Sequence, residues 1–597
     1  MIKELSELGK KLREESAGEK IVHDAIKDEP ISIDLVIKKD GSFIKFEPIE
    51  KIVRPAEAIT AKKGKARLLL DKAEEVLGYL GEEKKHKLFI DKLKEYEHLN
   101  ILRPVIAFYT TKKVDGIEKA LSAFEEQVNE KERSGNIAFR IENDDSRLHE
   151  KQEVYKAIID KYDKQKKEKL LSGSQKCSIC GKNNNPVEDV PHGMIKRVPD
   201  GQTSGCALVS YNDSAYESYN LIGNLNSQIC TACTRTYVEG LNWLMNNGNT
   251  QVIQNKNGKE KEIFKHSNRK NFGSDTAIVF WTKNDQQVSE LDLFDNPDPG
   301  TVAHLMESVA SGDINKSKYI DTDRFYSCTL SGAAARIAVR DWIEISIVDL
   351  KKAIARWFED IKIEAWGESY FPPLYRLANC AQNEKSDNKT TTSRIAMHLW
   401  KSSLKGIAPP LWILSAVLKR VRIIENAEDG GNKESVTPER AALIRLILNR
   451  NNKGGYMVTE KLDIENCSPP YICGRIFAVL EGIQRAALGK NINAGIRERF
   501  FSFASTNPSS AFGRLMKLSQ NHLSKLKNEK AGLAVILDRE LQELFSKIQE
   551  FPAIFTLEEQ GQFAIGYYHQ KQDTFKKAKS NAELKAATEE SDKETDD

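Results

Sequence analysis

The chain has 597 residues, of which 40% are hydrophobic and 30% charged, and 90 basic residues nearly cancel 87 acidic ones to leave a formal net charge of +3. This length exceeds one hydrophobic core and predicts roughly three or four domains. The small net charge excludes polyanion binding through bulk charge, so any nucleic-acid contact must come from local patches.

The start of the chain, MIKELSELGKKLREESAGEK, predicts an amphipathic helix and lacks the apolar segment of a signal peptide. No apolar run approaches the length of a membrane span. The chain has nine cysteines, too few for a disulfide scaffold. A cytoplasmic protein with no membrane contact is therefore expected.

The N-terminal region is predicted to contain a hairpin followed by helices. Residues 31–47 alternate apolar and polar side chains around Asp40-Gly41, a pair that tolerates the positive φ of a hairpin turn. Residues 62–170 are rich in Lys and Glu at helical spacing, which is typical of solvated helix faces.

Further along, RTYVEGLNWLM predicts a helix, residues 246–272 a polar loop, and DTAIVFW (275–281) a buried strand. Helices dominate from about residue 341, and proline pairs at 372, 409 and 469 end the helices before them. From residue 468 an apolar stripe recurs at helical spacing. It is formed by Ile472, Ile476, Leu480, Ile483 and Ala487.

The predicted fold class is α+β, with a mixed α/β N-terminal half, an inserted four-cysteine zinc module and an all-α C-terminal helical bundle. The expected divisions are an N-terminal α+β domain (1–175), a zinc-clamped loop module (176–236), the remainder of the α+β domain (237–345), a helical connecting domain (346–467), a C-terminal helical bundle (468–580) and a disordered acidic tail (581–597).

Two Cys-x-x-Cys pairs predict a metal site. Cys177 with Cys180, and Cys230 with Cys233, have the two-residue gap that lets both thiolates of a knuckle face one tetrahedral ion. Structural zinc contributes on the order of 10 kcal/mol, enough to offset closure of the long loop between the pairs. The alternatives are two unconnected pairs of buried cysteines or a redox dithiol.

A closed structural zinc site is favoured over a catalytic one, because four sulfur ligands leave no open position for water. The His-x-Glu or Cys-x-Glu segment of a zinc deaminase is absent from the sequence. His192 is expected to be an ordinary turn residue, and Cys206, the one spare ligand, is expected to be buried. No catalytic residues are predicted.

The metal would hold both ends of a loop that presents Lys196 and Arg197, followed by Gln202, Thr203 and Ser204 between two glycines. Basic residues followed by a glycine-flanked polar tip suit contact with a phosphate backbone and close approach to a groove. A plain surface turn beside the strand CALVSYN is the alternative.

A second candidate surface lies on the helix FGRLMKLSQNHLSKL. Its apolar side is predicted to contain Leu515, Met516, Leu518, Leu523 and Leu526. The opposite side carries Arg514, Lys517, Asn521 and Lys525. This basic face can follow the phosphates of a single strand, or it can be a plain solvated face.

Several blocks in order carry a family resemblance: GQTSGCALVSYNDSAYESY, DTAIVFW, ICGRIFAVLEGIQRAALGKNINAGIRERFFSFASTNPSSAFGRLMKLSQNHLSKL and LEEQGQFAIGYYHQK. Together they resemble the Csd-type large subunit of the type I-C CRISPR surveillance complex, over about residues 30–575. The family is defined by these blocks and not by a catalytic signature.

The resemblance implies a non-catalytic subunit that reads a short protospacer-adjacent motif in duplex DNA, aids duplex opening and recruits a separate helicase–nuclease, while guide pairing reads the rest of the target. Implied partners are guide RNA, target DNA, the backbone and repeat-cleaving subunits, and a small subunit from internal translation, for which Met457 is a candidate start. The expected motif-reading residues are Lys196, Arg197, Gln202, Thr203, Ser204 and Asn212.

Two other function classes stay open on the sequence. A metal-dependent nuclease would need an acidic cluster, of which Asp144 and Asp145 are the densest example near a polar turn, although the ten histidines show no metal-ligand spacing. A zinc-scaffolded interaction protein unrelated to nucleic acid is the third interpretation.

Overall fold

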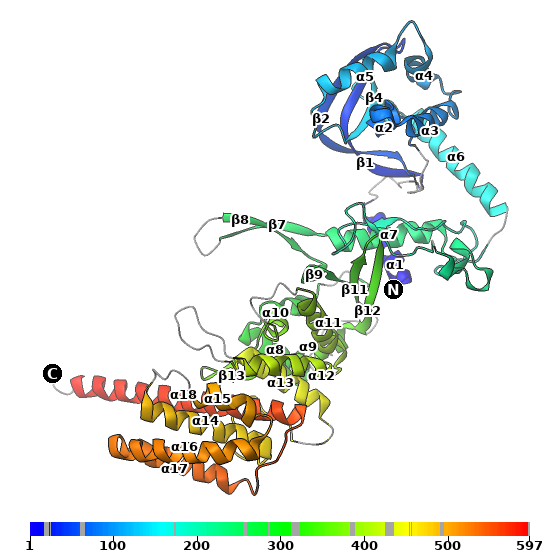
Figure 1. Cartoon of the computed structure of the whole chain (residues 1–597). Helices are drawn as coiled ribbons and strands as arrows, with labels where there is room; N and C mark the ends of the chain where they lie inside the picture. The colour runs from blue at the N-terminus through cyan, green and yellow to red at the C-terminus, as the bar shows by residue number, and fades with distance from the viewer. Residues whose placement is uncertain are drawn as a thin grey trace. The chain divides into compact units, whose positions relative to one another are not determined.

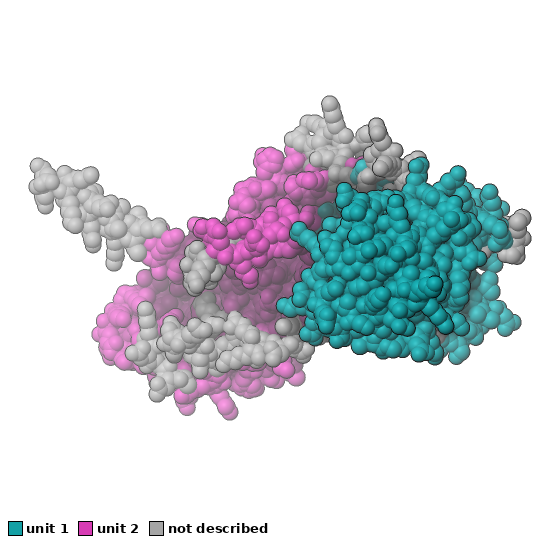
Figure 2. All heavy atoms as spheres, turned by 90° about the horizontal axis from the view of Figure 1, so that it is seen from above, with its two compact units in different colours: residues 1–247, 333–337 teal, residues 248–332, 338–597 magenta. Residues whose placement is uncertain are grey.

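The computed structural model describes residues 1–16, 23, 25–59, 66–171, 175–211, 213–254, 260–284, 287–311, 323–382, 389–423, 435–452, 454, 456–489 and 495–594. The chain divides into two units, which Figure 2 shows in different colours: unit 1 contains residues 1–247 and 333–337, and unit 2 contains residues 248–332 and 338–597. Among the described residues, no helix is both long enough and apolar enough to cross a membrane.

Unit 1 begins with a helix, continues into a small sheet domain and ends with a second long helix. Its helices are α1 (Ile2–Ser16), α2 (Ala73–Val76), α3 (Glu83–Lys94), α4 (Arg103–Thr110), α5 (Gly116–Gln127), α6 (Gln152–Leu171) and α7 (Thr231–Asn246). Its strands are β1 (Ile26–Ile37), β2 (Phe43–Glu57), β3 (Leu70–Lys72), β4 (Asn136–Ile141), β5 (Met194–Ile195) and β6 (Cys206–Ala207).

The predicted hairpin around Asp40-Gly41 is present as β1 and β2. Gly41 has φ +89°, and the Asp40 carboxylate accepts a hydrogen bond from the Ser42 backbone N–H at 2.9 Å, which lowers the pKa of Asp40. The four-stranded sheet has the order β2-β1-β4-β3, with β1 and β4 parallel. Helices α2–α5 lie together against this sheet in Figure 1, and their apolar side chains share a core with Leu35 and Phe139.

The two long helices at the ends of unit 1 pack on each other through glycines. A Cβ atom at Gly9 of α1 would lie 1.9 Å from the carbonyl oxygen of Thr236 in α7, so only glycine permits this approach. The Ser6 hydroxyl is hydrogen-bonded to the Thr236 hydroxyl at 2.7 Å, and Arg13 is paired with Glu239. Helix α7, which carries half of the cysteine cluster, is therefore held by the first helix of the chain.

Unit 2 combines a sheet with an extensive set of helices. Its strands are β7 (Gly248–Gln254), β8 (Glu260–His266), β9 (Arg269–Phe272), β10 (Thr276–Thr282), β11 (Arg324–Ala333), β12 (Arg336–Ser346), β13 (Ile363–Ala365) and β14 (Glu368–Tyr370). The end of β11 at Ala333 and the start of β12 at residues 336–337 belong to unit 1. The helices of unit 2 are α8 (Pro299–Ala310), α9 (Ile347–Ile361), α10 (Leu374–Asn379), α11 (Lys389–Lys405), α12 (Leu411–Arg422), α13 (Pro438–Asn451), α14 (Pro469–Leu488), α15 (Ile496–Ala504), α16 (Pro508–Glu529), α17 (Ala531–Ser546) and α18 (Leu557–Glu594).

The predicted strand DTAIVFW is present as β10, which pairs with β9 on one side and β11 on the other. Within residues 246–272, predicted as a polar loop, residues 248–254 and 260–266 instead pair as the antiparallel strands β7 and β8. Their Asn, Lys and Gly content indicated a loop, but most side chains of β8 are exposed, so the pairing needs no apolar face. Helix α18 continues through residues 581–594, where the sequence indicated a disordered tail.

One hydrophobic core extends from the sheet of unit 2 to the C-terminal helices, so residues 346–467 and 468–580 share it. The predicted stripe from Ile472 to Ala487 is buried along α14. Helices α14 and α18 lie side by side in Figure 1, and their contact requires glycine: a Cβ atom at Gly474 would lie 2.0 Å from the Phe563 carbonyl oxygen. The helical character of the C-terminal region is as predicted.

Candidate metal centre and nucleic-acid interface

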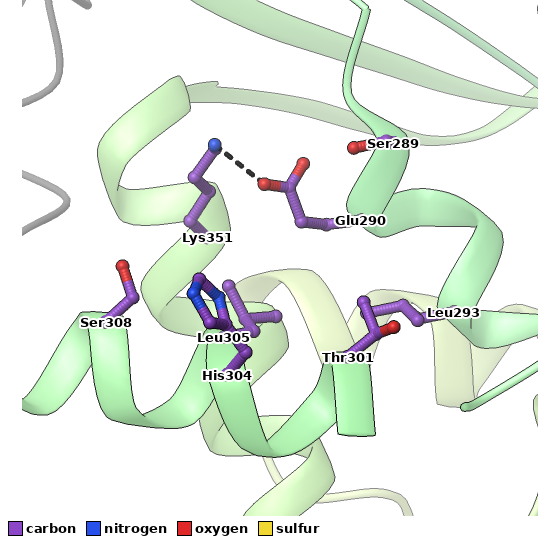
Figure 3. Close-up of a pocket in the computed structure, with 8 residues that line it drawn as sticks. All are labelled: Ser289, Glu290, Leu293, Thr301, His304, Leu305, Ser308 and Lys351. Carbon is purple, nitrogen blue, oxygen red and sulfur yellow. Dashed lines mark ion pairs between the residues drawn. The ribbon is translucent and has the colours of Figure 1, made fainter. Parts of the chain in front are cut away.

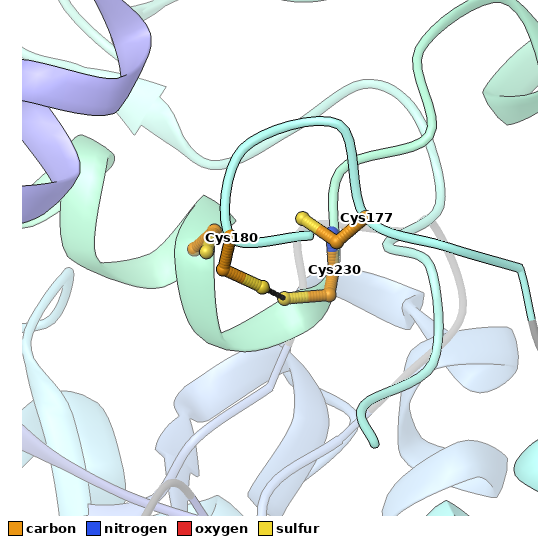
Figure 4. A group of neighbouring side chains, drawn as sticks. Cys177, Cys180 and Cys230 are labelled. Carbon is orange, nitrogen blue, oxygen red and sulfur yellow. Dashed lines mark hydrogen bonds between the residues drawn. The ribbon is translucent and has the colours of Figure 1, made fainter. Parts of the chain in front are cut away.

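The four predicted cysteines come together in unit 1. Figure 4 labels three of them, Cys177, Cys180 and Cys230. Cys177 and Cys180 lie in a tight turn that Gly181 closes, with φ +70° and a backbone hydrogen bond from its N–H to the Cys177 carbonyl at 2.9 Å. Cys230 is the N-cap residue of α7, and Cys233 lies in its first turn. A thiolate there faces the positive end of the helix dipole.

The spacing of the sulfur atoms fits a metal ion bound by four thiolates. The four Sγ atoms lie within 4.8 Å of one another, and those of Cys180 and Cys230 are 3.9 Å apart. Tetrahedral zinc with Zn–S bonds of about 2.3 Å would space its sulfurs about 3.8 Å apart. The Cys177 Sγ also accepts hydrogen bonds from the backbone N–H groups of Ile179 and Cys230, at 3.4 and 3.3 Å. Such bonds orient metal-binding thiolates.

Without a cation, the neighbouring thiols shift one another's pKa values. A hydrogen bond with Cys233, together with burial, raises the pKa of Cys230, and burial raises the pKa of Cys180. The bond donated by Cys230 lowers the pKa of Cys233. A divalent cation would offset the repulsion between the thiolates. Cys206 lies outside the cluster: as expected it is fully buried, and its thiol donates to the Ala334 carbonyl at 3.2 Å.

The two knuckles close the chain between them with a short ladder of backbone bonds. Ser178 N–H donates to the Gln228 carbonyl at 2.8 Å, and Glu188 N–H donates to the Ile229 carbonyl at 2.8 Å. Thr231 N–H donates to the Pro186 carbonyl at 2.9 Å. Residues 181–229 are therefore a loop whose ends meet at the cysteine cluster.

Within that loop, five predicted DNA-contacting residues lie in the turn between β5 and β6, residues 196–205, called the β5–β6 turn below. All five side chains are exposed: Lys196, Arg197, Gln202, Thr203 and Ser204. The turn is closed by a bond from Gly205 N–H to the Gln202 carbonyl at 2.9 Å, and Lys196 N–H donates to the Asn242 side chain of α7 at 2.9 Å. Asn212 lies outside the described residues.

Glycine is required on both sides of the polar tip. Gly205 has φ +112°, and a Cβ atom there would lie 2.8 Å from the Cβ of Met194. A Cβ atom at Gly201 would lie 2.4 Å from the Cys206 sulfur. The glycines thus let the turn pack against β5 and β6, whereas the sequence indicated close approach to a ligand as their role.

Two side chains that support this region were not identified from the sequence. His192, expected to be a turn residue, is 1% exposed and hydrogen-bonded through Nδ1 to the Tyr237 hydroxyl of α7 at 2.7 Å. Burial lowers its pKa to about 4, so the ring is neutral. Arg336, from the segment Ala333–Ile337, lies over the Tyr216 ring at 5.3 Å and donates to its hydroxyl at 2.7 Å. Long sequence separation hides both contacts.

The second predicted surface is on α16 in unit 2. Arg514, Lys517, Asn521 and Lys525 are all exposed along one side of the helix, and Lys525 is paired with Glu529 at 3.8 Å. Of the predicted apolar side, Leu515, Leu523 and Leu526 are buried. Leu518 is not: it is 38% exposed, because its position lies between the apolar stripe and the basic face.

The acidic turn that a nuclease would need lies beside a cavity of about 1000 Å³ in unit 1. Asp144 accepts hydrogen bonds from Lys151 at 2.7 Å and from Ser146, and the bond from Lys151 lowers the pKa of Asp144 to about 2. Asp145 lines the same cavity. Among the described residues, only the four cysteines form a group of three or more side chains close enough to hold a metal ion.

A smaller cavity of about 260 Å³ lies in unit 2 between the 3₁₀ turn Ser289–Phe294 and helices α8 and α9 (Figure 3). Lys351 and Glu290 form an ion pair across it at 2.7 Å, and His304 points toward it from α8. None of the predicted site residues lines this cavity.

Comparison with known families identifies the family of the chain. A model described as CRISPR-associated protein (Cas_Csd1) matches residues 5–575. The chain belongs to the Csd1 family of CRISPR-associated proteins. The resemblance to a Csd-type, type I-C large-subunit family is thereby confirmed, and the Csd1 match includes the cysteine cluster, the β5–β6 turn and α16. No match was found among curated proteins.

Proposed function

We propose that this Csd1-family protein is the large subunit of a type I-C, RNA-guided surveillance complex, in which it reads a protospacer-adjacent motif in double-stranded DNA without breaking bonds itself. The observation that carries the proposal is the exposed β5–β6 turn, held by α7 and by a loop whose ends meet at four cysteines. The family match to CRISPR-associated proteins gives this turn a nucleic-acid context.

The chemistry of the turn suits a groove of duplex DNA. Gln202, Thr203 and Ser204 are exposed neutral donors and acceptors, which can pair with base edges. Lys196 and Arg197 precede them and can contact phosphates, which position a protein on the duplex without reading sequence. Guide pairing would read the remaining target, so a few base pairs suffice for the protein.

Zinc is the metal that we propose for the cysteine cluster, because four thiolates at tetrahedral spacing are its typical structural ligands. The ion would neutralise thiolate charge and fix the ends of residues 181–229. Its role would be structural, since four sulfur ligands leave no position for a substrate. The side chains that would hold it are Cys177, Cys180, Cys230 and Cys233.

The remaining roles concern partners. The displaced DNA strand would contact the basic face of α16, which is formed by Arg514, Lys517, Asn521 and Lys525. The complex would act in the cytoplasm with guide RNA, backbone and repeat-cleaving subunits and a recruited helicase–nuclease. Met457, which is 56% exposed and precedes α14, is the proposed internal start of a small subunit. An undiminished short product after replacement of Met457 would exclude that start.

The test is a double substitution in the turn, Gln202→Ala with Ser204→Ala. The affinity of the assembled complex for motif-bearing duplex DNA should fall by about tenfold or more, because a lost base-edge contact costs ~1–3 kcal/mol. Binding of guide-complementary single strands should be unchanged. The matched control is Ser214→Ala with Ser218→Ala, two exposed residues of the same loop outside the turn. Equal losses on both substrates would place motif reading elsewhere.

A further inference from the structure

The turn between β13 and β14 in unit 2 combines a strained backbone with an exposed aromatic ring. Trp366 and Gly367 connect β13 to β14, where Ala365 pairs with Glu368, and have φ +53° and +88°. Two central residues in the left-handed region define the hairpin turn in which Asn-Gly is strongly preferred. Tryptophan is a poor choice for that backbone, because its Cβ crowds the neighbouring carbonyl.

Burial of the indole does not compensate for this strain. The Trp366 side chain is 55% exposed, although its backbone N–H is anchored to the Gln572 side chain of α18 at 3.0 Å. The turn is therefore fixed in place while much of the ring faces solvent. A costly conformation that core packing does not explain is a feature of functional sites.

The ring belongs to a row of aromatic and guanidinium groups. Tyr370 meets Trp366 edge to face, with centroids 5.7 Å apart. Arg376 donates from Nη1 to the Tyr370 hydroxyl and from Nε to the Tyr375 hydroxyl, both at 3.3 Å. Tyr375 is 49% exposed. The row thus ends in an exposed ring on each side, with an arginine between Tyr370 and Tyr375.

We propose that Trp366, Tyr375 and Arg376 form a stacking platform for unpaired bases of single-stranded nucleic acid. The inference rests on the proposed function and adds a second contact for the opened strand. Flat rings and a guanidinium plane bind bases of any sequence, since every base has a π face.

The surroundings favour bases over an apolar protein partner. Between residues 361 and 382, Trp366 and Tyr375 are the only exposed large hydrophobic side chains. Their neighbours are charged: Lys576 is paired with Glu364 at 3.0 Å, and Arg376 lies 3.5 Å from Glu439. Protein hot spots lie among contacts that exclude water, whereas exposed rings beside charged groups suit stacking on bases.

Because Lys576 and Arg376 are already paired with carboxylates, stacking and not phosphate attraction would provide most of the affinity. Loss of the ring should then weaken binding by the same factor at low and high salt. Loss of a phosphate contact would instead lower the salt dependence of binding. This difference separates the platform from the basic face of α16.

The experiment replaces Trp366 by Asn, the residue that its backbone conformation favours. Full-length protein is titrated into fluorescein-labelled oligothymidylate and, separately, oligouridylate, with anisotropy as the readout, so that DNA and RNA are distinguished. Trp366→Asn should weaken binding to one or both by about tenfold while leaving the thermal midpoint equal to or above that of the parent. Trp412→Ala, on an exposed tryptophan of α12, is the matched control and should bind as the parent does.

Unchanged oligonucleotide binding by Trp366→Asn would overturn the inference, as would an unchanged affinity of Tyr375→Ala if the Trp366 variant failed to fold. Loss of another subunit from the complex with normal oligonucleotide binding would also overturn it, by making the row a protein contact. Motif-bearing duplex is measured alongside. If the Trp366 variant binds all substrates as the parent does, while the Gln202/Ser204 variant no longer binds motif-bearing duplex, the platform is refuted and the proposed function is not.

Discussion

Replacing Cys177 by Ser tests the metal centre most directly, because this sulfur is 1% exposed and accepts two backbone hydrogen bonds as well as facing the other three. A serine oxygen is shorter and remains protonated, so it cannot replace the thiolate as the fourth ligand. We expect the variant to lose its bound metal.

The part of the effect that comes from chain entropy follows from the loop that the metal closes. Cys177 and Cys230 are 53 residues apart, and a cross-link over that distance stabilises the folded state by about 4 kcal/mol through the entropy of the unfolded chain. For a unit of this size, that corresponds to a fall in the melting temperature of unit 1 of roughly 10 °C. The change should be largest in unit 1, since all four cysteines belong to it.

Three measurements on the full-length protein follow the change: elemental analysis of bound zinc, thermal unfolding, and hydrogen exchange at the amides of Glu188 and Thr231, whose bonds join the ends of the loop. The matched control is Cys206→Ser, a buried cysteine of the same unit that lies outside the cluster and whose hydroxyl could still donate to Ala334. Parent-like zinc content and amide protection in Cys177→Ser would refute the site.

Three further outcomes are expected. Burial lowers the pKa of His569 to about 3, from about 6.5 in the unfolded chain. The unfolding free energy of unit 2 should therefore fall as the pH drops from about 6.5 to 3, by up to about 1.4 kcal/mol per pH unit. In urea titrations, His569→Gln should make the unfolding free energy less dependent on pH, and an unchanged pH dependence would contradict this. Lys517→Ala should reduce the slope of log affinity against log salt concentration for single-strand binding by about 0.7. Lys525→Ala should reduce this slope less, because Lys525 is already paired with Glu529. Equal slopes in both variants would count against a phosphate contact on α16. Purified protein should leave DNA intact with Mg²⁺ or Mn²⁺, whereas cleavage that disappears on replacing Asp144 and Asp145 by Ala would establish a nuclease.

Short-range patterns predicted the local structure well. The hairpin at Asp40-Gly41, strand β10, helix α7 and the two cysteine knuckles each depend on spacing within a few residues, which the sequence displays directly. Hairpin β7–β8 was missed because its stabilisation comes from backbone pairing and not from alternating apolar residues. Leu518 was misplaced because a straight helical repeat does not show where one helix face ends and the next begins.

Contacts between segments far apart in the chain could not be predicted from the sequence. Nothing local marks His192 as the buried partner of Tyr237, or places Arg336 over Tyr216, because each pair forms only after the intervening chain has folded. The glycine at position 9 likewise has no visible purpose until α7 lies against it. Trp366 was overlooked because the sequence does not reveal that Trp-Gly occupies a turn with left-handed backbone.

The packing of α1 on α7 has a consequence for synthesis on the ribosome. The first helix emerges more than two hundred residues before the helix that receives it, which at 5–20 residues per second is a wait of roughly ten seconds or longer. During that interval the sheet domain encoded between them can fold alone, while Leu5 and Leu8 of the waiting helix have no burial site on α7. Docking of α1 therefore waits for the second cysteine knuckle, because that knuckle begins the helix against which α1 packs.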